Sequence, residues 1–143
     1  METVVVGVDN GDTSTRAVEF AVERAKKNDW KVILVHVIPW TPYSFNTPSE
    51  NEHRHEQKEH EIAAANEQIM TPMSAIAEEG GVPHEELVVH GKPSDTMIDV
   101  AKENNAVHLI VGRIGDSGLR EAIFGSVASR LVQHAHIPVT VVP

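Results

Sequence analysis

The sequence predicts an α/β protein: an open five-stranded parallel sheet in the order 3-2-1-4-5, with helices on both faces. Five short runs rich in Val, Ile and Leu alternate with segments of helical periodicity. The runs are almost continuously apolar, which is typical of strands covered on both faces. Alternating strands and helices favour parallel βαβ units, and right-handed crossovers arrange five strands most simply in this order.

The strands are expected at residues 3–9, 31–39, 85–90, 107–112 and 138–142. Apolar residues at helical spacing predict helices over 13–28, 52–79, 94 or 95 to about 104, and from 125–126 onward. Asp12 or Thr13 is the expected cap of the first helix. Pro72 should kink or split the second helix, because proline cannot donate the helical hydrogen bond.

Composition narrows the possible functions. A length of 143 residues suggests a single domain over 1–143. The sequence contains no run of 18 apolar residues, so no membrane span is expected. Its first residues do not form a signal-peptide pattern. Cysteine is absent, which fits the reducing cytoplasm. The formal net charge of −9, with no basic cluster longer than Lys26-Lys27, argues against nucleic acid and against anionic membranes as partners.

A ligand site is expected where the strand order reverses, beyond the carboxyl ends of the first and fourth strands. The first strand ends at Asp9, followed by Asn10-Gly11, and the fourth ends at Gly112, which opens the stretch "GRIGDSGLREAIFGS". The two most unusual loops of the sequence therefore meet at the predicted crevice.

The glycine-rich loop has two interpretations. Glycines at 112, 115 and 118 could let backbone N–H groups curl around a phosphate, with Gly125-Ser126 opening a helix whose N-terminus favours an anion. Alternatively, the loop is a turn that only needs small residues. Asp9 could likewise accept hydrogen bonds from a ribose, or simply cap a turn after the first strand. The sequence has neither a Walker A motif nor G-x-G-x-x-G after its first strand.

The spacing Gly112-x2-Gly115-x9-Gly125-Ser126 resembles the nucleotide loop of the universal stress protein family, G-x2-G-x9-G-[ST]. The resemblance extends over "VVVGVDNGDTSTRAVEFA", "VILVHVIP", "VVHGKPSDTMIDVAKENNAVHLIVG" and "GSVASRLVQHAHIPVTVV". It covers nearly all of the chain except residues 40–75. It implies a Rossmann-like fold of the adenine nucleotide alpha hydrolase-like type and a stress-response or regulatory role with slow or absent turnover.

The resemblance also implies a site for ATP or another adenine nucleotide, with Mg²⁺. Asp9 would contact the ribose, and the backbone of Val37 would meet the adenine edge. Ribose and phosphates would be held by Gly112, Gly115, Gly125 and Ser126, with the N–H of Val127 assisting. The sequence departs from the family at Asn10-Gly11 and at Asp116, whose carboxylate would repel a triphosphate unless Mg²⁺, Arg113 or Arg120 compensates.

Other chemistry is less well supported. His53, His55 and His60 are interpreted as part of a solvated charged face rather than a metal site, and His36 as a strand histidine satisfied by a neighbour. No G-x-S-x-G or H-E-x-x-H motif is present. The alternatives to a nucleotide-binding regulator are a slow ATPase, a phosphoryl or adenylyl transferase, and a nucleotide-free interaction module.

The last strand, 138–142, is expected at an edge of the sheet, where an apolar strand risks aggregation unless it is covered. Pairing with the same strand of a second chain would cover it, which predicts a homodimer. The alternative is a monomer in which Pro138 and Pro143 blunt the edge.

Overall fold

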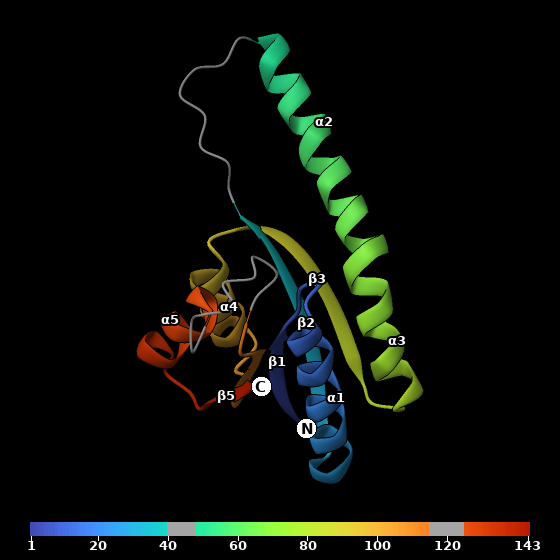
Figure 1. The fold of residues 1–143 in the computed structure, drawn as a ribbon, viewed down its shortest axis with the longest axis vertical. Helices are drawn as coiled ribbons and strands as arrows, with labels where there is room; N and C mark the ends of the chain where they lie inside the picture. Colours follow the sequence, from blue (N-terminus) through green and yellow to red (C-terminus); the bar gives the residue numbers. More distant parts are fainter. Residues whose placement is uncertain (40–47, 115–124) are drawn as a thin grey trace.

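The five strands form one parallel sheet in the order β3-β2-β1-β4-β5, which confirms the predicted topology (Figure 1). The computed structural model describes residues 1–39, 48–114 and 125–143. Its strands are β1 (Glu2–Gly7), β2 (Trp30–Pro39), β3 (His84–Gly91), β4 (His108–Gly112) and β5 (Val139–Val142). Its helices are α1 (Asp12–Asn28), α2 (Pro48–Ala65), the π-helical turn η1 (Asn66–Met70), α3 (Thr71–Glu79), α4 (Pro93–Glu103) and α5 (Ser126–His134).

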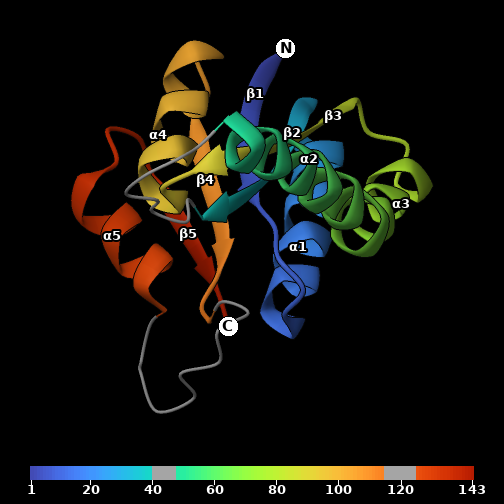
Figure 2. The same ribbon diagram turned by 90° about the horizontal axis from the view of Figure 1, so that it is seen from above.

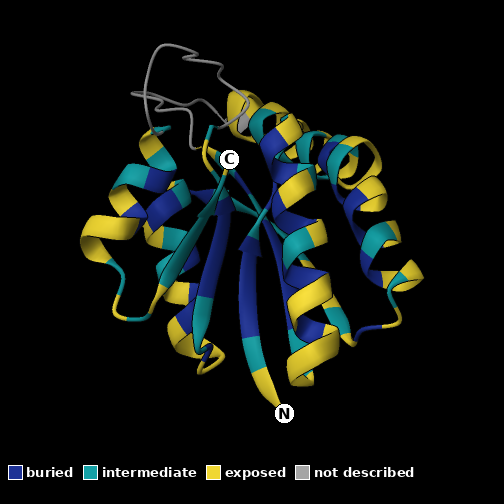
Figure 3. Cartoon of the chain, turned by 60° about the horizontal axis from the view of Figure 1, so that its bottom comes forward, coloured by how far each residue is buried: buried dark blue, intermediate teal, exposed yellow. Residues whose placement is uncertain are grey.

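The helices lie in two layers, one on each face of the sheet (Figure 2). Val4 and Val6 of β1 point to the face covered by α1 and α3, whereas Val5 points to the face covered by α4 and α5. This alternation explains the nearly continuous apolar runs, because each strand must bury both of its faces. Figure 3 shows the result: buried residues follow the strands and the inward sides of the helices, and exposed residues occupy the outer sides.

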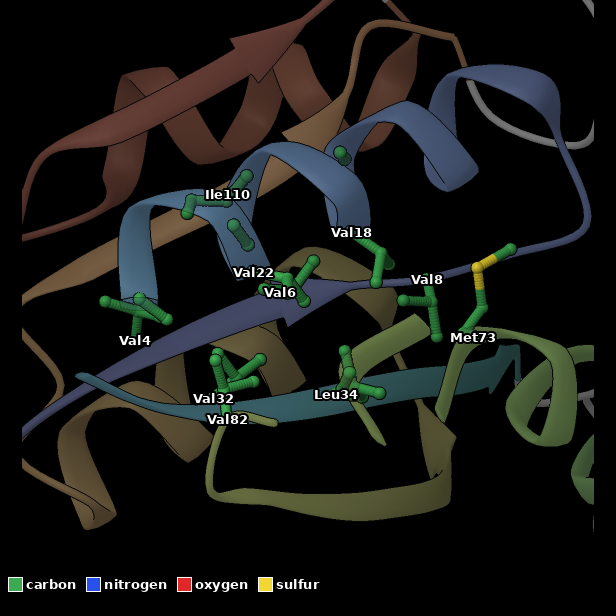
Figure 4. Packing of buried hydrophobic residues seen from close by; sticks show 14 of the residues in the cluster. Val4, Val6, Val8, Val18, Val22, Val32, Leu34, Met73, Val82 and Ile110 are labelled. Atoms are coloured by element: carbon green, nitrogen blue, oxygen red, sulfur yellow. The ribbon is translucent and has the colours of Figure 1, made fainter. Parts of the chain in front are cut away.

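The core on the α1 face is built from aliphatic side chains of β1 and β2 at matched register, covered by the helices. Val4 and Val6 lie opposite Val32 and Leu34 of β2, and Val18 of α1 packs over them (Figure 4). All five are fully buried. Complete burial of one such side chain contributes about 1.5–3 kcal/mol, so this layer fixes the position of α1 against the sheet.

The start of α1 differs from the prediction. Gly11 is the N-cap, and neither Asp12 nor Thr13 caps the helix. The side chain of Asp9 shapes this corner instead, because its Oδ1 accepts the N–H of Gly11 at 2.8 Å. The hydroxyl of Thr13 is used elsewhere: it donates to the carbonyl of Ile114 at 2.6 Å. A side chain that could cap a helix can therefore form a hydrogen bond with a distant part of the chain and leave the helix without that cap.

The second predicted helix is interrupted by a π turn just before Pro72, near the place where the proline predicted a kink or a split. It begins at Pro48, widens into the π turn η1, and continues as α3 with Pro72 in its first turn. The Oγ1 and the N–H of Thr71 both bond to the carbonyl of Asn66, which closes the wider turn just before the proline. The first turn of a helix tolerates proline, because its N–H would have no helical partner there.

His108 and Thr140 join β4 to the edge strand β5. The Nε2 atom of His108 lies 2.6 Å from the Oγ1 of Thr140, and the ring packs at 6.2 Å from that of Trp30. Burial lowers the pKa of His108 below its ordinary value of 6.5, because desolvation disfavours the charged ring.

The pKa of His108 predicts a specific loss of stability in acid. As the pH falls below 6.5, the unfolded chain binds the proton before the folded chain does, so the folded state loses its advantage. We expect the free energy of unfolding of the wild type to decrease from pH 7 to pH 5.5 more than that of His108→Gln, measured by urea denaturation. Exposed His55 provides the control substitution, His55→Gln. A difference between wild type and His108→Gln that is independent of pH would contradict this assignment.

Candidate functional site

The site begins where β1 stops pairing with β2. Their register ends at Gly7 and Val35, followed by one further bond from the N–H of Val8 to the carbonyl of Val35 at 2.8 Å. β2 continues to Pro39 beyond this point. Because backbone groups two residues apart on a strand point to the same side, the N–H and C=O of Val37 face the space that β1 has left. A donor and an acceptor therefore stand side by side at this edge.

A cavity of about 560 Å³ occupies this place, at the carboxyl ends of β1, β2 and β4. That volume lies within the usual range for small-molecule sites. Six of the seven predicted site residues line it, namely Asp9, Val37, Gly112, Gly125, Ser126 and Val127. Gly115 lies outside the described residues, as do Gly118, Asp116 and Arg120. The structure thus brings together every predicted site residue that it describes.

Asp9 has a definite structural task at the rim of the cavity. Its Oδ1 accepts the N–H of Gly11, and its own N–H donates to the Oγ of buried Ser14 at 2.9 Å. These two bonds turn the chain from β1 into α1. The turn-capping interpretation of Asp9 therefore holds, and Asp9 is also one of the residues that line the cavity.

Gly112 is required by packing. A Cβ atom built at Gly112 would lie 2.7 Å from the carbonyl carbon of Thr13 and would also collide with the Oγ1 of that residue. The close approach lets Thr13 donate to the carbonyl of Ile114 and hold the chain as it leaves β4. At Gly112, the structure therefore supports the second interpretation of the loop, in which the position requires a small residue.

The N-terminus of α5 opens onto the same cavity. Gly125 is its N-cap, with φ −66° and ψ 161°, and none of the described side chains caps the helix. The first helical bond joins the N–H of Ser129 to the carbonyl of Gly125 at 3.0 Å. The N–H groups of Ser126, Val127 and Ala128 come earlier and have no helical acceptor, so they present a partial positive charge.

Arg113 fixes this helix relative to the sheet. Its carbonyl accepts the N–H of Gly125 at 2.7 Å, and its N–H donates to the carbonyl of Val142 in β5, also at 2.7 Å. Arg113 at the end of β4 thereby connects Gly125 of α5 with Val142 of β5. Arg113 also lines the cavity. Among the described lining residues, Arg113 carries the positive charge and Asp9 the negative charge.

Sequence reasoning missed several wall residues. Ile69 comes from η1, and Pro93 and Met97 come from the start of α4. Ile69 and Met97 each keep helical spacing with other apolar residues of the sequence, which predicts that they face inward but does not indicate that they reach a cavity. His36 also lines it, and the predicted neighbour is the carbonyl of Val8, 2.7 Å from the Nδ1 atom.

The described residues offer no other obvious chemistry. Within residues 1–39, 48–114 and 125–143, no three His, Asp or Glu side chains are grouped so that they could hold a metal ion. His53, His55 and His60 are exposed on α2, where His55 pairs with Glu59 at 3.0 Å. In the same part of the chain, no helix is both long and apolar enough to cross a membrane.

The chain belongs to the universal stress protein family, whose sequence model matches residues 1–143. A universal stress protein of Methanocaldococcus jannaschii is 28% identical over 139 residues, covering 97% of this chain and 80% of the relative. Another, from Bacillus subtilis, is 28% identical over 143 residues and covers 97% of both chains.

Solved structures of universal stress proteins have the same fold as this chain, and some of them contain a bound nucleotide. A universal stress protein of Lactobacillus plantarum superposes with a TM-score of 0.85 at 24% identity, over 99% of this chain and 97% of that one. One from Archaeoglobus fulgidus, in complex with dAMP, has a TM-score of 0.64 at 26% identity over 100% and 98%. A third, in complex with cAMP, has a TM-score of 0.66 at 27% identity over 99% and 96%.

The contact between Gly112 and Thr13 gives a testable prediction. Gly112→Ala should lower the free energy of unfolding by about 1–3 kcal/mol, because the added methyl group meets backbone that cannot move aside. Gly81→Asn is the control: Gly81 has φ +68°, which asparagine tolerates, and open space around it. Urea denaturation of both variants measures the effect. Equal losses would show that Gly112 has no special steric role.

Proposed function

We propose that the chain is a cytoplasmic regulatory protein of the stress response that binds ATP, or another adenine nucleotide, with Mg²⁺ in this cavity. One observation carries the proposal: the edge of Val37 and the uncapped N-terminus of α5 open onto the same cavity. The first offers a donor and an acceptor for a base, and the second offers N–H groups for an anion. The dAMP and cAMP complexes of relatives support the choice of an adenine nucleotide.

The rest of the cavity suits such a ligand. Val37, Ile69 and Met97 provide apolar walls for a flat base. Asp9 lies between the base end and the phosphate end in the proposed arrangement, where its carboxylate would accept hydrogen bonds from a ribose. Ser126 would add a hydroxyl donor to the N–H groups of α5, and Arg113 would supply positive charge near the phosphates. Mg²⁺, when bound, would offset the charge that phosphates and nearby carboxylates share.

Calorimetric titration of ATP into protein stripped of nucleotide, with and without Mg²⁺, tests the proposal. We expect saturable binding at micromolar ATP. Absence of heat up to millimolar ATP would overturn it.

Two substitutions at Ser126 separate the proposed contact of its backbone N–H with phosphate from that of its hydroxyl. Ser126→Pro removes a backbone N–H but suits the first helical position, because Gly125 already has the extended conformation that precedes proline. Ser126→Ala removes only the hydroxyl. A charge-assisted hydrogen bond contributes about 1.5–3 kcal/mol, so the proline variant should bind ATP roughly 10–100-fold more weakly than the alanine variant. Equal affinities of the two variants would exclude the N–H of Ser126 as a phosphate contact.

We also propose a homodimer through β5. Leu109 donates its N–H to the carbonyl of Pro138, and Arg113 donates to that of Val142, so these carbonyls face β4. The period of two places the backbone groups of Val139 and Val141 on the side of β5 away from β4, where a second copy would pair.

Val141→Pro should convert the dimer to a folded monomer. It removes an outward N–H without touching the ladder to β4, a position where edge strands accept proline. Val141→Ala keeps the N–H and serves as the control that should remain dimeric. Sedimentation equilibrium at micromolar concentration gives the answer, and circular dichroism checks the fold. A wild type that is monomeric, or a proline variant that remains dimeric, would contradict the proposed interface.

A further inference from the structure

His36 lines the cavity next to Val37 and carries a ring nitrogen that can accept a hydrogen bond. Its Nδ1 atom lies 2.7 Å from the carbonyl oxygen of Val8. A carbonyl only accepts, so Nδ1 carries the hydrogen, and the neutral ring then has an unprotonated Nε2 atom. Within the described ranges, Nε2 forms no hydrogen bond with another residue. His36 is half-buried and lines the cavity, and its bond to the carbonyl of Val8 fixes the tautomer of the ring.

The edge of Val37 and the ring of His36 together match one kind of base. The backbone of Val37 offers one N–H and one C=O, which suit the N1 atom of adenine and one hydrogen of its 6-amino group. The 6-amino group has a second hydrogen, which needs another acceptor when it is buried. His36 directly precedes Val37 on β2, and its Nε2 is such an acceptor. A 6-oxopurine has a carbonyl oxygen in place of the 6-amino group. That oxygen and the Nε2 of His36 are both acceptors, so no hydrogen bond can form between them.

We propose that His36 is a specificity-determining residue that selects a 6-aminopurine over a 6-oxopurine by accepting a hydrogen bond at Nε2. This inference rests on the proposed function, because it requires that a purine nucleotide bind with its base beside Val37. It goes beyond that function in assigning base discrimination to a side chain.

The test compares ATP with ITP, its 6-oxo counterpart, by calorimetric titration of the wild type and of His36→Phe. Phenylalanine keeps a ring of similar size and removes the acceptor. A neutral hydrogen bond contributes about 0.5–1.5 kcal/mol, so the preference for ATP over ITP should fall about 3–10-fold in the variant. His134→Phe, at an exposed histidine of α5, is the matched control and should keep the wild-type preference.

The ratio of the two affinities separates recognition from stability. Phenylalanine also loses the bond to Val8, and a purely structural role would weaken ATP and ITP equally and leave the ratio unchanged. That result would overturn the inference while ATP binding itself stands. If the wild type binds neither nucleotide, the proposed function fails and the inference fails with it.

A second measurement uses the wild type alone and does not depend on whether the variant folds. N6-methyl-ATP retains one hydrogen on the 6-amino group, which cannot serve the carbonyl of Val37 and the Nε2 of His36 together, so one of the two hydrogen bonds is lost. It should bind about 3–10-fold more weakly than ATP. Equal binding of the two nucleotides would overturn the inference.

Discussion

The site depends on one event in the sheet: β1 stops pairing with β2 one residue after Gly7. The bond from the N–H of Val8 to the carbonyl of Val35 is the last backbone hydrogen bond between this segment and β2. Past it, the chain turns at Asp9 into α1, while β2 runs on and leaves the edge of Val37 open. The carbonyl of Val8 then holds His36. A change in where β1 ends would move the cavity's base end, its rim and its histidine together.

On the other side of the cavity, the geometry is fixed by close packing. Gly112 lets Thr13 approach the end of β4, and Thr13 in turn holds Ile114 through its hydroxyl. Arg113 joins α5 to β5 through two backbone bonds. Here glycine and backbone contacts position the helix whose N–H groups face the cavity, so stability and ligand geometry depend on the same residues.

Sequence patterns predicted the features that follow from hydrophobic burial. Runs such as "VILV" in β2 must be covered on both faces, and that requirement, with crossover handedness, was sufficient for the strand order and hence for the crevice. The sequence could not show which use a polar or small residue would find in three dimensions. Thr13 bonds Ile114 and does not cap α1, and Gly112 accommodates Thr13. The π turn that brings Ile69 to the cavity has no local signature beyond the nearby Pro72.

Net charge is a poor guide to this site, because a charge on a distant element is screened before it reaches the cavity. Five glutamates lie on α2, which Figure 1 shows extending beyond the end of β2. Glu52 is 17 residues before Ile69 along a nearly continuous helix, or about 25 Å at 1.5 Å per residue. The screening length at physiological salt is about 8 Å, so such a charge has little effect where Ile69 meets the cavity. The field that an anion would experience there comes from groups within a few ångströms, above all the N–H groups of α5 and the side chains of Asp9 and Arg113. A chain with net charge −9 can therefore hold an anionic ligand, provided that these local groups are oriented as the fold orients them.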